Sequence, residues 1–488
     1  ENCIQCNRCA YVCPHAVIRP VALTAEEAAN APEGMKTLDL TGMKEYKFTM
    51  SVSALDCTGC GSCVNVCPGK KGAKALAMEN LEASADEQKY FDYTVKLPVK
   101  EDVIAKFKEA TVKGSQFKQP LLEFSGACAG CGETPYAKLI TQLFGDRMYI
   151  ANATGCSSIW GNSSPSTPYT VNAKGQGPAW SNSLFEDNAE FGYGMLLAQR
   201  AIRDGLKAKV EDVVANGTNE DVKAAGQEWL DTFAVGATNG AATDKLVAAL
   251  EACGCDKAKE ILAQKDFLAK KSQWIFGGDG WAYDIGFGGV DHVLASGRDI
   301  NVMVFDTEVY SNTGGQASKA SNIGEVCQFA AAGKEISKKS LAEIAMSYGY
   351  VYVAQIALGA NPAQAVKAIA EAESYNGPSL IIGYAPCELH GIAKGGMNHC
   401  QDEMKKAVKA GYWNLFSFNP ALKAEGKNPF TLTSKEGDGS YQEFLNNEAR
   451  YTRLIKPFPE RAEKLFAESE KTANARYQHL LKLVELYK

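Results

Sequence analysis

The sequence lacks three features that would each suggest a class of protein. It has no excess of positive charge, since 51 Lys and Arg face 57 Asp and Glu for a formal net charge of -6, and this argues against a nucleic-acid-binding protein. It has no run of about 18 apolar residues, so no membrane-spanning helix is predicted. It begins ENCIQC, without the basic start and apolar stretch of a signal peptide. We therefore expect a cytoplasmic protein and, because a metal-type cysteine stands at position 3, a fragment of a longer chain.

Histidine is also scarce, with five in 488 residues. No histidine has an evident catalytic partner in the sequence, so ordinary structural use is expected. His390 is the exception, because it lies three residues after Cys387 and could tune a metal cluster there. The other four are His15, His292, His399 and His479.

Cysteine, by contrast, is abundant, with sixteen residues. A chain of this length can bury a large core and needs no disulfides to stabilise it. The spacing of the cysteines is that of metal ligands, which indicates a reducing compartment.

Two stretches repeat one cysteine pattern, CIQCNRCAYVCP at 3–14 and CTGCGSCVNVCP at 57–68. Both have the C-x2-C-x2-C-x3-C-P spacing of two-cluster bacterial ferredoxins, in which the fourth cysteine of each run binds the other cluster. A zinc ribbon or a disulfide framework does not explain two such runs that both end in proline. The predicted ligands are Cys3, Cys6, Cys9 and Cys67 for one 4Fe-4S cluster and Cys57, Cys60, Cys63 and Cys13 for the other.

Residues 273–306 predict a strand, a turn, a helix and a second strand, which together form a βαβ unit of a parallel sheet. The turn is GGDG, where Gly277, Gly278 and Gly280 let the backbone approach a phosphorylated ligand at the carboxyl end of the strand. The carboxylate of Asp279 would repel a diphosphate unless a cation lies between them. The turn therefore predicts Mg2+.

The second strand leads into DTEVYSNTGGQASK at 306–319. Octahedral magnesium takes about six oxygen ligands. The Asp279 carboxylate, the Thr307 hydroxyl and the Val309 carbonyl would supply three, with two phosphate oxygens and one water supplying the others. The spacing resembles the GDG-to-Asn magnesium motif of thiamine diphosphate enzymes, many of which have Asn where this chain has Thr307.

The pair Cys128 and Cys131, in SGACAGCGETPY at 125–136, needs two further ligands to close a four-coordinate site. Cys156 and Cys387 each follow an apolar strand-like run, and ligand sites in open α/β sheets gather at such strand ends. These four cysteines are the predicted third site. Zinc would also accept four thiolates, but it cannot pass electrons to the ferredoxin clusters, so we expect a third 4Fe-4S cluster. The remaining cysteines are expected to be buried or incidental thiols away from these strand ends, with Cys327 and Cys400 each on a helix: Cys253, Cys255, Cys327 and Cys400.

The whole chain resembles the C-terminal part of the pyruvate:ferredoxin oxidoreductase (pyruvate synthase) family. The stretches that carry the resemblance are GACAGCGETPY, NATGCSSIWG, GPAWSNSLFEDNAEFGYGM, GGDGWAYDIG and DTEVYSNTGGQASK. It implies a small α+β ferredoxin-like domain with two clusters over residues 1–101. It also implies an α/β domain over 102–488, in which helices cover both faces of a parallel sheet that binds thiamine diphosphate and a proximal cluster. The Ala/Lys/Glu-rich stretch at about 206–271 is expected to be a helical insertion.

The resemblance also implies roles for individual residues. Glu133 and Cys156 would lie beside the cofactor, and Asn312 would face the reacting thiazolium as a catalytic residue. The residues expected to bind the diphosphate and magnesium are Gly278, Asp279, Gly280, Trp281, Thr307, Glu308, Val309, Tyr310, Ser311 and Asn312.

The implied activity is the reversible oxidative decarboxylation of pyruvate with coenzyme A to acetyl-CoA and CO2. Electrons would pass from thiamine diphosphate through three 4Fe-4S clusters to an external ferredoxin or flavodoxin. A homodimer is expected, and groups for the aminopyrimidine, the substrate carboxylate and coenzyme A are expected in an N-terminal part of the same enzyme. One alternative is another 2-oxoacid:ferredoxin oxidoreductase, acting on 2-oxoglutarate or a different oxoacid. A second is an electron-transfer subunit without catalysis, against which the predicted magnesium site counts.

Overall fold

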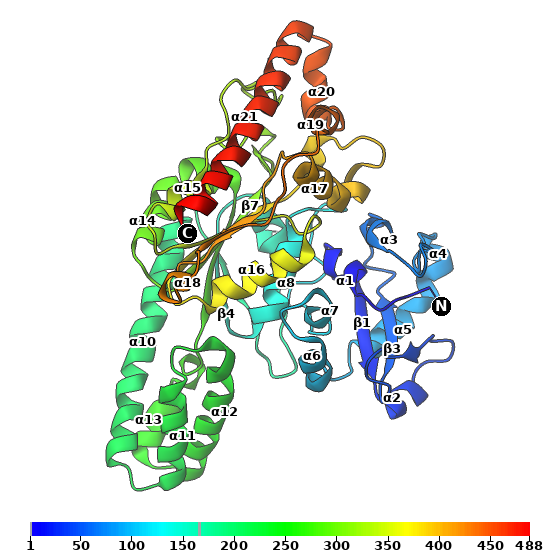
Figure 1. Ribbon diagram of the computed structural model, residues 1–488. Coiled ribbons are helices and arrows are strands. Elements are labelled where there is room, and N and C mark those ends of the chain that lie inside the picture. Colours follow the sequence, from blue (N-terminus) through cyan, green and yellow to red (C-terminus); the bar gives the residue numbers. More distant parts are fainter. Residues whose placement is uncertain (1, 164–166) are drawn as a thin grey trace.

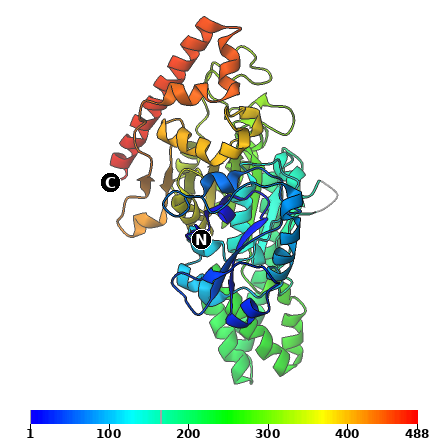
Figure 2. The same ribbon diagram turned by 90° about the vertical axis from the view of Figure 1, so that its right-hand side faces the viewer.

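A computed structural model describes residues 2–163 and 167–488 of the chain. A ferredoxin-like unit packs beside a larger α/β unit, and a helical projection and the C-terminal helices extend from the latter in opposite directions (Figure 1). Figure 2 shows the ferredoxin-like unit in front, between these two extensions. The expected fold class is therefore confirmed. Within the described residues, no helix is both long and apolar enough to cross a bilayer.

The ferredoxin-like unit repeats one loop-and-helix arrangement beside an antiparallel sheet of order β1-β3-β2. Each cysteine-rich loop leads into a five-residue helix, α1 (Arg8–Val12) or α3 (Ser62–Val66), whose N-cap residue has a left-handed backbone. The other elements of this unit are β1 (Ile18–Leu23), α2 (Ala25–Ala29), β2 (Leu38–Asp39), β3 (Lys47–Val52), α4 (Leu81–Ser84), η1 (Ala85–Glu87), α5 (Gln88–Thr94), α6 (Glu101–Phe107) and α7 (Val112–Ser115).

One apolar core joins the small sheet to the segment that follows it. Val103 and Phe117 pack in the same cluster of buried side chains as Leu40 and Phe48. The ring of Phe117 lies edge-on to that of Phe48, with the ring centroids 6.4 Å apart. The ferredoxin-like unit is thus held together by contacts that reach as far along the chain as Phe117.

The α/β unit is built on an eight-stranded sheet of order β13-β12-β10-β11-β7-β6-β4-β5. The six strands from β10 to β5 run parallel, and β12 and β13 are antiparallel additions at one edge. The central strand β7 is buried along its whole length, as expected where helices cover both faces. The strands are β4 (Met148–Asn152), β5 (Ala179–Asn182), β6 (Ser272–Gly278), β7 (Ile300–Asp306), β10 (Tyr352–Ile356), β11 (Pro378–Tyr384), β12 (Phe416–Phe418) and β13 (Phe430–Leu432).

The connections between strands explain why both faces of the sheet are covered. The crossovers β6 to β7 and β10 to β11 run in opposite directions along the sheet, so right-handed connections place their helices, α14 and α16, on opposite faces. Figure 1 shows α10, α14 and α15 on one side and α8 and α16 on the other. The elements at this level are α8 (Thr134–Phe144), η2 (Gly145–Arg147), α9 (Cys156–Ser158), η3 (Ile159–Ser163), α10 (Asn188–Asn216), η5 (Gly280–Ile285), α14 (Phe287–Ala295), β8 (Val309–Tyr310), β9 (Gln316–Ala317), α15 (Leu341–Met346) and α16 (Pro362–Ser374).

The helical projection has a core of its own. It comprises the outer part of α10 with α11 (Glu220–Asp231), α12 (Gly236–Cys253), α13 (Asp256–Leu262) and η4 (Lys265–Phe267). Val210, Trp229 and Leu246 are buried in its core, separately from the core of the large sheet. The first turns of α10 pack against β4 and β6, so this single helix belongs to both cores.

The C-terminal elements are joined to the sheet by a buried ionic network around Arg450, which is 2% exposed. Its Nη1 lies 2.8 Å from Glu308 Oε2 at the end of β7 and 3.3 Å from Glu325 Oε1, and its Nε lies 2.6 Å from Glu448 Oε2. Charges this deeply buried are tolerated because they are paired. The elements of this region are η6 (Glu388–His390), η7 (Gly396–His399), α17 (Cys400–Lys409), α18 (Ala421–Ala424), α19 (Tyr441–Asn446), α20 (Ala449–Ile455) and α21 (Pro459–Leu486).

Glu448 should make the stability of the fold depend on pH. Burial raises the pKa of Glu448 from 4.5 to about 8, although Arg450 opposes this shift. Between about pH 4.5 and 8 the folded chain therefore keeps a proton on Glu448 that the unfolded chain loses. The stabilisation from this group is complete below about pH 4.5 and is lost as the pH rises to about 8. Glu448→Gln stays neutral, so its free energy of unfolding should gain on that of the wild type between pH 5 and 8 by up to about 1.4 kcal/mol per pH unit, and its Tm should rise relative to that of the wild type. Calorimetry would measure this, and parallel Tm curves would contradict it.

Candidate functional site

An open cavity lies at the carboxyl ends of the parallel strands. Its walls come from the loop before α8 and from the segments that follow β4, β7 and β11. The structure thus brings residues predicted for the third cysteine site and for the thiamine cofactor around one space. The predicted residues that line the cavity are Cys128, Cys131, Glu133, Cys156, Thr307, Ser311, Asn312 and Cys387.

A close backbone approach brings two of these cysteine segments together. A Cβ atom at Gly132 would lie 2.5 Å from the carbonyl oxygen of Pro386, so only glycine allows the loop of Cys131 to pack against the segment of Cys387. Burial raises the pKa of the Cys387 thiol to about 12 and raises the pKa of Cys131 and Cys156 as well. Iron would offset that cost, because metal ions bind and stabilise the thiolate form.

The thiols of the third cysteine site do not converge as the ligands of one tetrahedral metal ion would. A tetrahedral zinc ion with Zn-S bonds of about 2.3 Å would hold its four sulfurs about 3.8 Å apart. Across residues 2–163 and 167–488, no three Cys, His, Asp or Glu side chains converge on a point where one ion could bind. The four cysteines line one pocket, and their role as ligands of a cluster stays a prediction.

The cysteines of the two ferredoxin-type runs also gather into the predicted sets. One pocket is lined by cysteines from both runs, which are Cys3, Cys6, Cys9 and Cys67. In the second set, burial and, in smaller part, the neighbouring Cys13 raise the pKa of Cys63 to about 12. Cys13 likewise neighbours Cys57. The fourth cysteine of each run therefore lies with the first three cysteines of the other run.

Three oxygen atoms, which we call the oxygen cluster, meet beside the cavity: Asp279 Oδ1, Thr307 Oγ1 and the Val309 carbonyl oxygen. Thr307 Oγ1 lies 3.0 Å from each of the other two. Ligands on adjacent corners of a magnesium octahedron are about 2.9 Å apart, so this spacing fits the ion. Asp279 is fully buried, and its second carboxylate oxygen accepts a hydrogen bond from the Ser318 hydroxyl at 2.6 Å. Sequence reasoning missed Ser318, whose contact with Asp279 only the fold reveals.

Some residues predicted to bind the cofactor form the frame around this site. A Cβ atom at Gly280 would lie 2.6 Å from the ring of Tyr310, so the glycine permits that contact. Gly278 ends β6 just before Asp279. The indole of Trp281 is fully buried, and Glu308 turns its carboxylate into the network of Arg450. The structure does not place either of these last two side chains in the cavity.

Burial shifts the pKa of two titratable side chains near the cavity in the direction that favours their uncharged forms. Burial raises the pKa of Glu133 to about 7, and its Oε2 accepts a hydrogen bond from Trp160 Nε1 at 2.8 Å. Burial lowers the pKa of His390 to about 3. The η6 turn directs His390 Nε2 toward Thr307, to whose carbonyl it donates at 2.8 Å, and tuning of a cluster at Cys387 by this histidine stays a prediction.

Two cysteines lie in surroundings that differ from those expected. Cys400 is fully buried at the start of α17, with its Sγ 3.9 Å from the carbonyl of Pro386. It therefore lies beside the third cysteine site, because η7 folds back toward that loop. Cys327 lies in a turn closed by a hydrogen bond from the Ala330 amide, and not on a helix.

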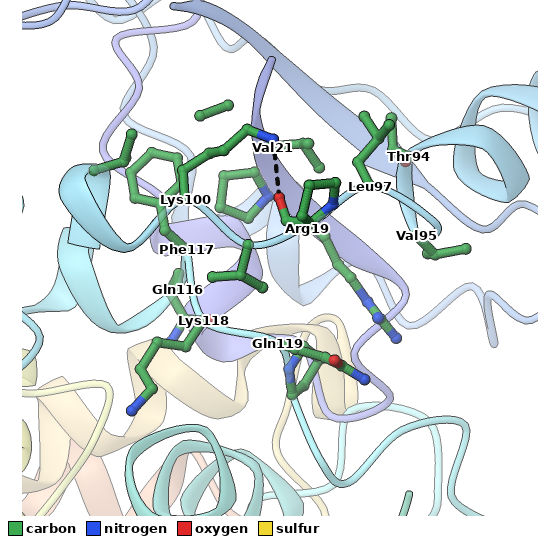
Figure 3. Close-up of a pocket in the computed structure, with 16 residues that line it drawn as sticks. Arg19, Val21, Thr94, Val95, Leu97, Lys100, Gln116, Phe117, Lys118 and Gln119 are labelled. Carbon is green, nitrogen blue, oxygen red and sulfur yellow. Dashed lines mark hydrogen bonds between the residues drawn. The ribbon is translucent and has the colours of Figure 1, made fainter. Parts of the chain in front are cut away.

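A further pocket lies in the ferredoxin-like unit between β1 and residues 94–120 (Figure 3). Its cations are already paired. Arg19 binds Glu123, and Lys100 lies 2.6 Å from Glu27 and donates to the carbonyl of Pro98. No cysteine is among the residues that line it. The pocket therefore does not contribute to the site.

Comparisons with known proteins identify two domains. Residues 2–71 match the family described as 4Fe-4S dicluster domain. Residues 261–382 match the C-terminal TPP binding domain of thiamine pyrophosphate enzymes. The second match includes β6, β7 and the oxygen cluster. The chain therefore carries a dicluster ferredoxin domain and a thiamine diphosphate-binding domain.

Curated relatives match nearly the whole chain. It is 56% identical over 495 residues to the pyruvate:ferredoxin oxidoreductase of Moorella thermoacetica. That alignment covers 99% of this chain and 42% of the relative. It is 52% identical over 485 residues to a pyruvate-flavodoxin oxidoreductase of Klebsiella pneumoniae, covering 99% and 41%. It is 49% identical over 492 residues to the mitochondrial pyruvate dehydrogenase [NADP(+)] of Euglena gracilis, covering 99% and 27%. The chain thus spans about two fifths of the first two relatives.

The third cysteine site can be tested by removing one ligand. In the full-length protein, Cys387→Ala should lose about four of about twelve iron atoms per chain, because one of three clusters loses a thiolate. The two ferredoxin-type clusters should remain. Cys327→Ala is the matched control and should keep all the iron, since its turn lies outside the cavity lining. Iron analysis and EPR of the reduced proteins would decide, and a Cys387→Ala variant with full iron content would exclude this ligand.

Proposed function

We propose that this chain, which is homologous over 99% of its length to pyruvate:ferredoxin and pyruvate-flavodoxin oxidoreductases, is the part of such an enzyme that binds three 4Fe-4S clusters and the diphosphate end of thiamine diphosphate. The reaction is the reversible oxidative decarboxylation of pyruvate with coenzyme A to acetyl-CoA and CO2. Ferredoxin or flavodoxin accepts the electrons. One observation supports this most directly: the third cysteine site and the thiamine-site residues Thr307, Ser311 and Asn312 line one cavity.

The residues of this chain would bind and orient the cofactors. Bound thiamine diphosphate supplies an electron sink for the carbanion left when CO2 departs, and iron-sulfur clusters supply one-electron carriers. Asp279, Thr307 and Val309 would bind Mg2+, whose charge compensates the diphosphate and the buried carboxylate. Asn312 lines the cavity among the cysteines, where its amide would orient the reacting end of the cofactor. The remainder of the enzyme would bind coenzyme A, the aminopyrimidine and the substrate carboxylate.

Contacts between the two units support an order for the clusters. Burial and, in smaller part, the neighbouring Cys131, Cys387 and Cys60 raise the pKa of Cys400, so this thiol lies between the third site and the second ferredoxin-type set. Met397 lines the cavity, and its carbonyl accepts a hydrogen bond from Ser62 Oγ of α3 at 3.4 Å. We infer that the cluster of Cys57, Cys60, Cys63 and Cys13 is the middle one. The cluster of Cys3, Cys6, Cys9 and Cys67 is then the terminal one.

This order predicts different behaviour for loss of the two ferredoxin-type clusters. Cys57→Ala removes a ligand of the middle cluster, so pyruvate and coenzyme A should reduce only the third-site cluster. Cys6→Ala removes a ligand of the terminal cluster, so the same substrates should still reduce two clusters. Spin quantitation by EPR after substrate addition would distinguish the variants, with iron analysis to verify that each has lost one cluster. The opposite result would reverse the order.

The alternatives differ in substrate and in the need for thiamine diphosphate. The three relatives described above are all named as pyruvate enzymes, which favours pyruvate over 2-oxoglutarate or another oxoacid. A panel of 2-oxoacids, with ferredoxin reduction as the readout, would test this preference. An electron-transfer subunit would need no magnesium site, and the spacing of the oxygen cluster counts against that function.

Asp279 provides the direct test of the proposed function. In the full-length enzyme, Asp279→Ala should abolish Mg2+-dependent binding of thiamine diphosphate and pyruvate-dependent reduction of ferredoxin, because the carboxylate that attracts the cation is gone. Iron content should not change. Asp284→Asn is the matched control, because its carboxylate lies on the same turn but pairs with Lys319 at 2.6 Å. Calorimetric titration with and without Mg2+ would measure binding, and unchanged affinity in Asp279→Ala would refute the site.

A further inference from the structure

Glu308 has a backbone conformation that glutamate rarely adopts. Its φ is 63°, in the left-handed region that favours glycine. It stands between Thr307 and Val309, and this turn curls the chain so that the hydroxyl of one and the carbonyl of the other lie 3.0 Å apart in the oxygen cluster. The strained residue thus lies between two of the proposed magnesium ligands in the chain, although its own carboxylate points into the network of Arg450.

The carboxylate of Glu308 is fully buried and held by four donors. Two of the donors are cations, and two are neutral groups. The contacts to Oε2 are Arg450 Nη1 at 2.8 Å and Tyr412 OH at 2.6 Å, and those to Oε1 are Lys338 Nζ at 3.0 Å and Asn322 Nδ2 at 2.8 Å. The main chain is held as well, since the Glu308 carbonyl accepts a hydrogen bond from Ser321 Oγ and its amide donates to Asp306 Oδ1 at 3.1 Å.

The charges in this network favour one position for the side chain. Arg450 and Lys338 each pair with one oxygen of the Glu308 carboxylate. Lys338 Nζ also lies 2.8 Å from Asp306 Oδ2, so one buried cation contacts the residues on both sides of Thr307. Moving the Glu308 carboxylate would leave buried charges unpaired, which is costly.

We propose that Glu308 is a positioning residue for the divalent cation. Its buried ion pairs with Lys338 and Arg450 hold the left-handed turn, and the turn presents the oxygens of Thr307 and Val309 beside Asp279. The cation itself is magnesium if the proposed function holds, and the inference rests on that function. Glu308 acts only through its neighbours, because its side chain lies outside the cavity lining.

A matched pair of substitutions separates the backbone from the charge. Glu308→Ala and Glu308→Gly both delete the carboxylate, but only glycine adopts a positive φ without strain. In the full-length enzyme, Glu308→Ala should raise the Mg2+ concentration needed for half-maximal binding of thiamine diphosphate about tenfold or more. Glu308→Gly should recover most of that loss. Titration of cofactor binding at several Mg2+ concentrations measures this, with iron content and EPR verifying that each variant is folded.

Three outcomes would overturn the proposal. The first is wild-type Mg2+ dependence in Glu308→Ala. The second is an equal loss in the alanine and glycine variants, which would show that the left-handed backbone at position 308 plays no part in the effect. The third comes from a second pair of variants. If neither Glu308 variant folds, Lys338→Met and Glu325→Gln are compared instead. Lys338 pairs directly with Asp306 and Glu308. Glu325 pairs with Arg450, as Glu308 does, but its side chain does not bond to the described residues 306–309. The expected result is a higher Mg2+ concentration for half-maximal binding only in Lys338→Met, and equal Mg2+ requirements in the two variants are the third overturning outcome.

Failure of this inference can be distinguished from failure of the proposed function. If the wild type binds thiamine diphosphate without regard to Mg2+, or Asp279→Ala binds it normally, the magnesium site itself is wrong. If the wild type requires Mg2+ and Asp279→Ala loses binding, the site stands. The Glu308 pair then tests the positioning role alone.

Discussion

The arrangement at the carboxyl edge of the sheet depends on one buried carboxylate, that of Asp279. A charge removed from water must be compensated, and here desolvation and the nearby Asp306 raise the pKa of Asp279 well above its usual value. Hydrogen bonds from Thr307 and Ser318 satisfy its oxygens, but they carry no positive charge. A divalent cation would supply that charge, and the nearby oxygens of Thr307 and Val309 would be further ligands for it.

The same edge of the sheet determines how electrons would leave the site. The third cysteine site opens toward η7, and η7 packs against α3 of the ferredoxin-like unit. Asn65 of α3 donates to Asp402 Oδ2 at 2.8 Å and to the Asn398 carbonyl at 3.1 Å, so side-chain hydrogen bonds fix the two units at this contact. The ferredoxin-like unit is therefore docked where the proposed path between clusters passes.

Short-range patterns were readable from the sequence, and long-range contacts were not. The cysteine runs and the GGDG turn announce their chemistry locally, because tight loops need a fixed spacing, and the βαβ unit around the turn appears in the structure as expected. The choice of Cys156 and Cys387 relied on the rule that ligands gather at strand ends, and the structure places both at the predicted cavity, although their role stays a prediction. Cys400 was misplaced because the return of η7 toward this loop has no local signature. Arg450 lies 142 residues from Glu308, so nothing in the sequence links them.

The separate core of the helical projection explains how so long an excursion fits between two strands that lie close together in the sheet. It leaves the sheet after β5 and returns at β6, and β6 lies only two places from β5 in the sheet. Closing a disordered loop of that length would cost conformational entropy. Here the helices bury Trp229 and Leu246 among themselves, and the free energy of that burial offsets the cost of ordering the segment. A segment of this kind behaves as a module: it can lengthen, shorten or change sequence in evolution while the strands that frame the cavity keep their register.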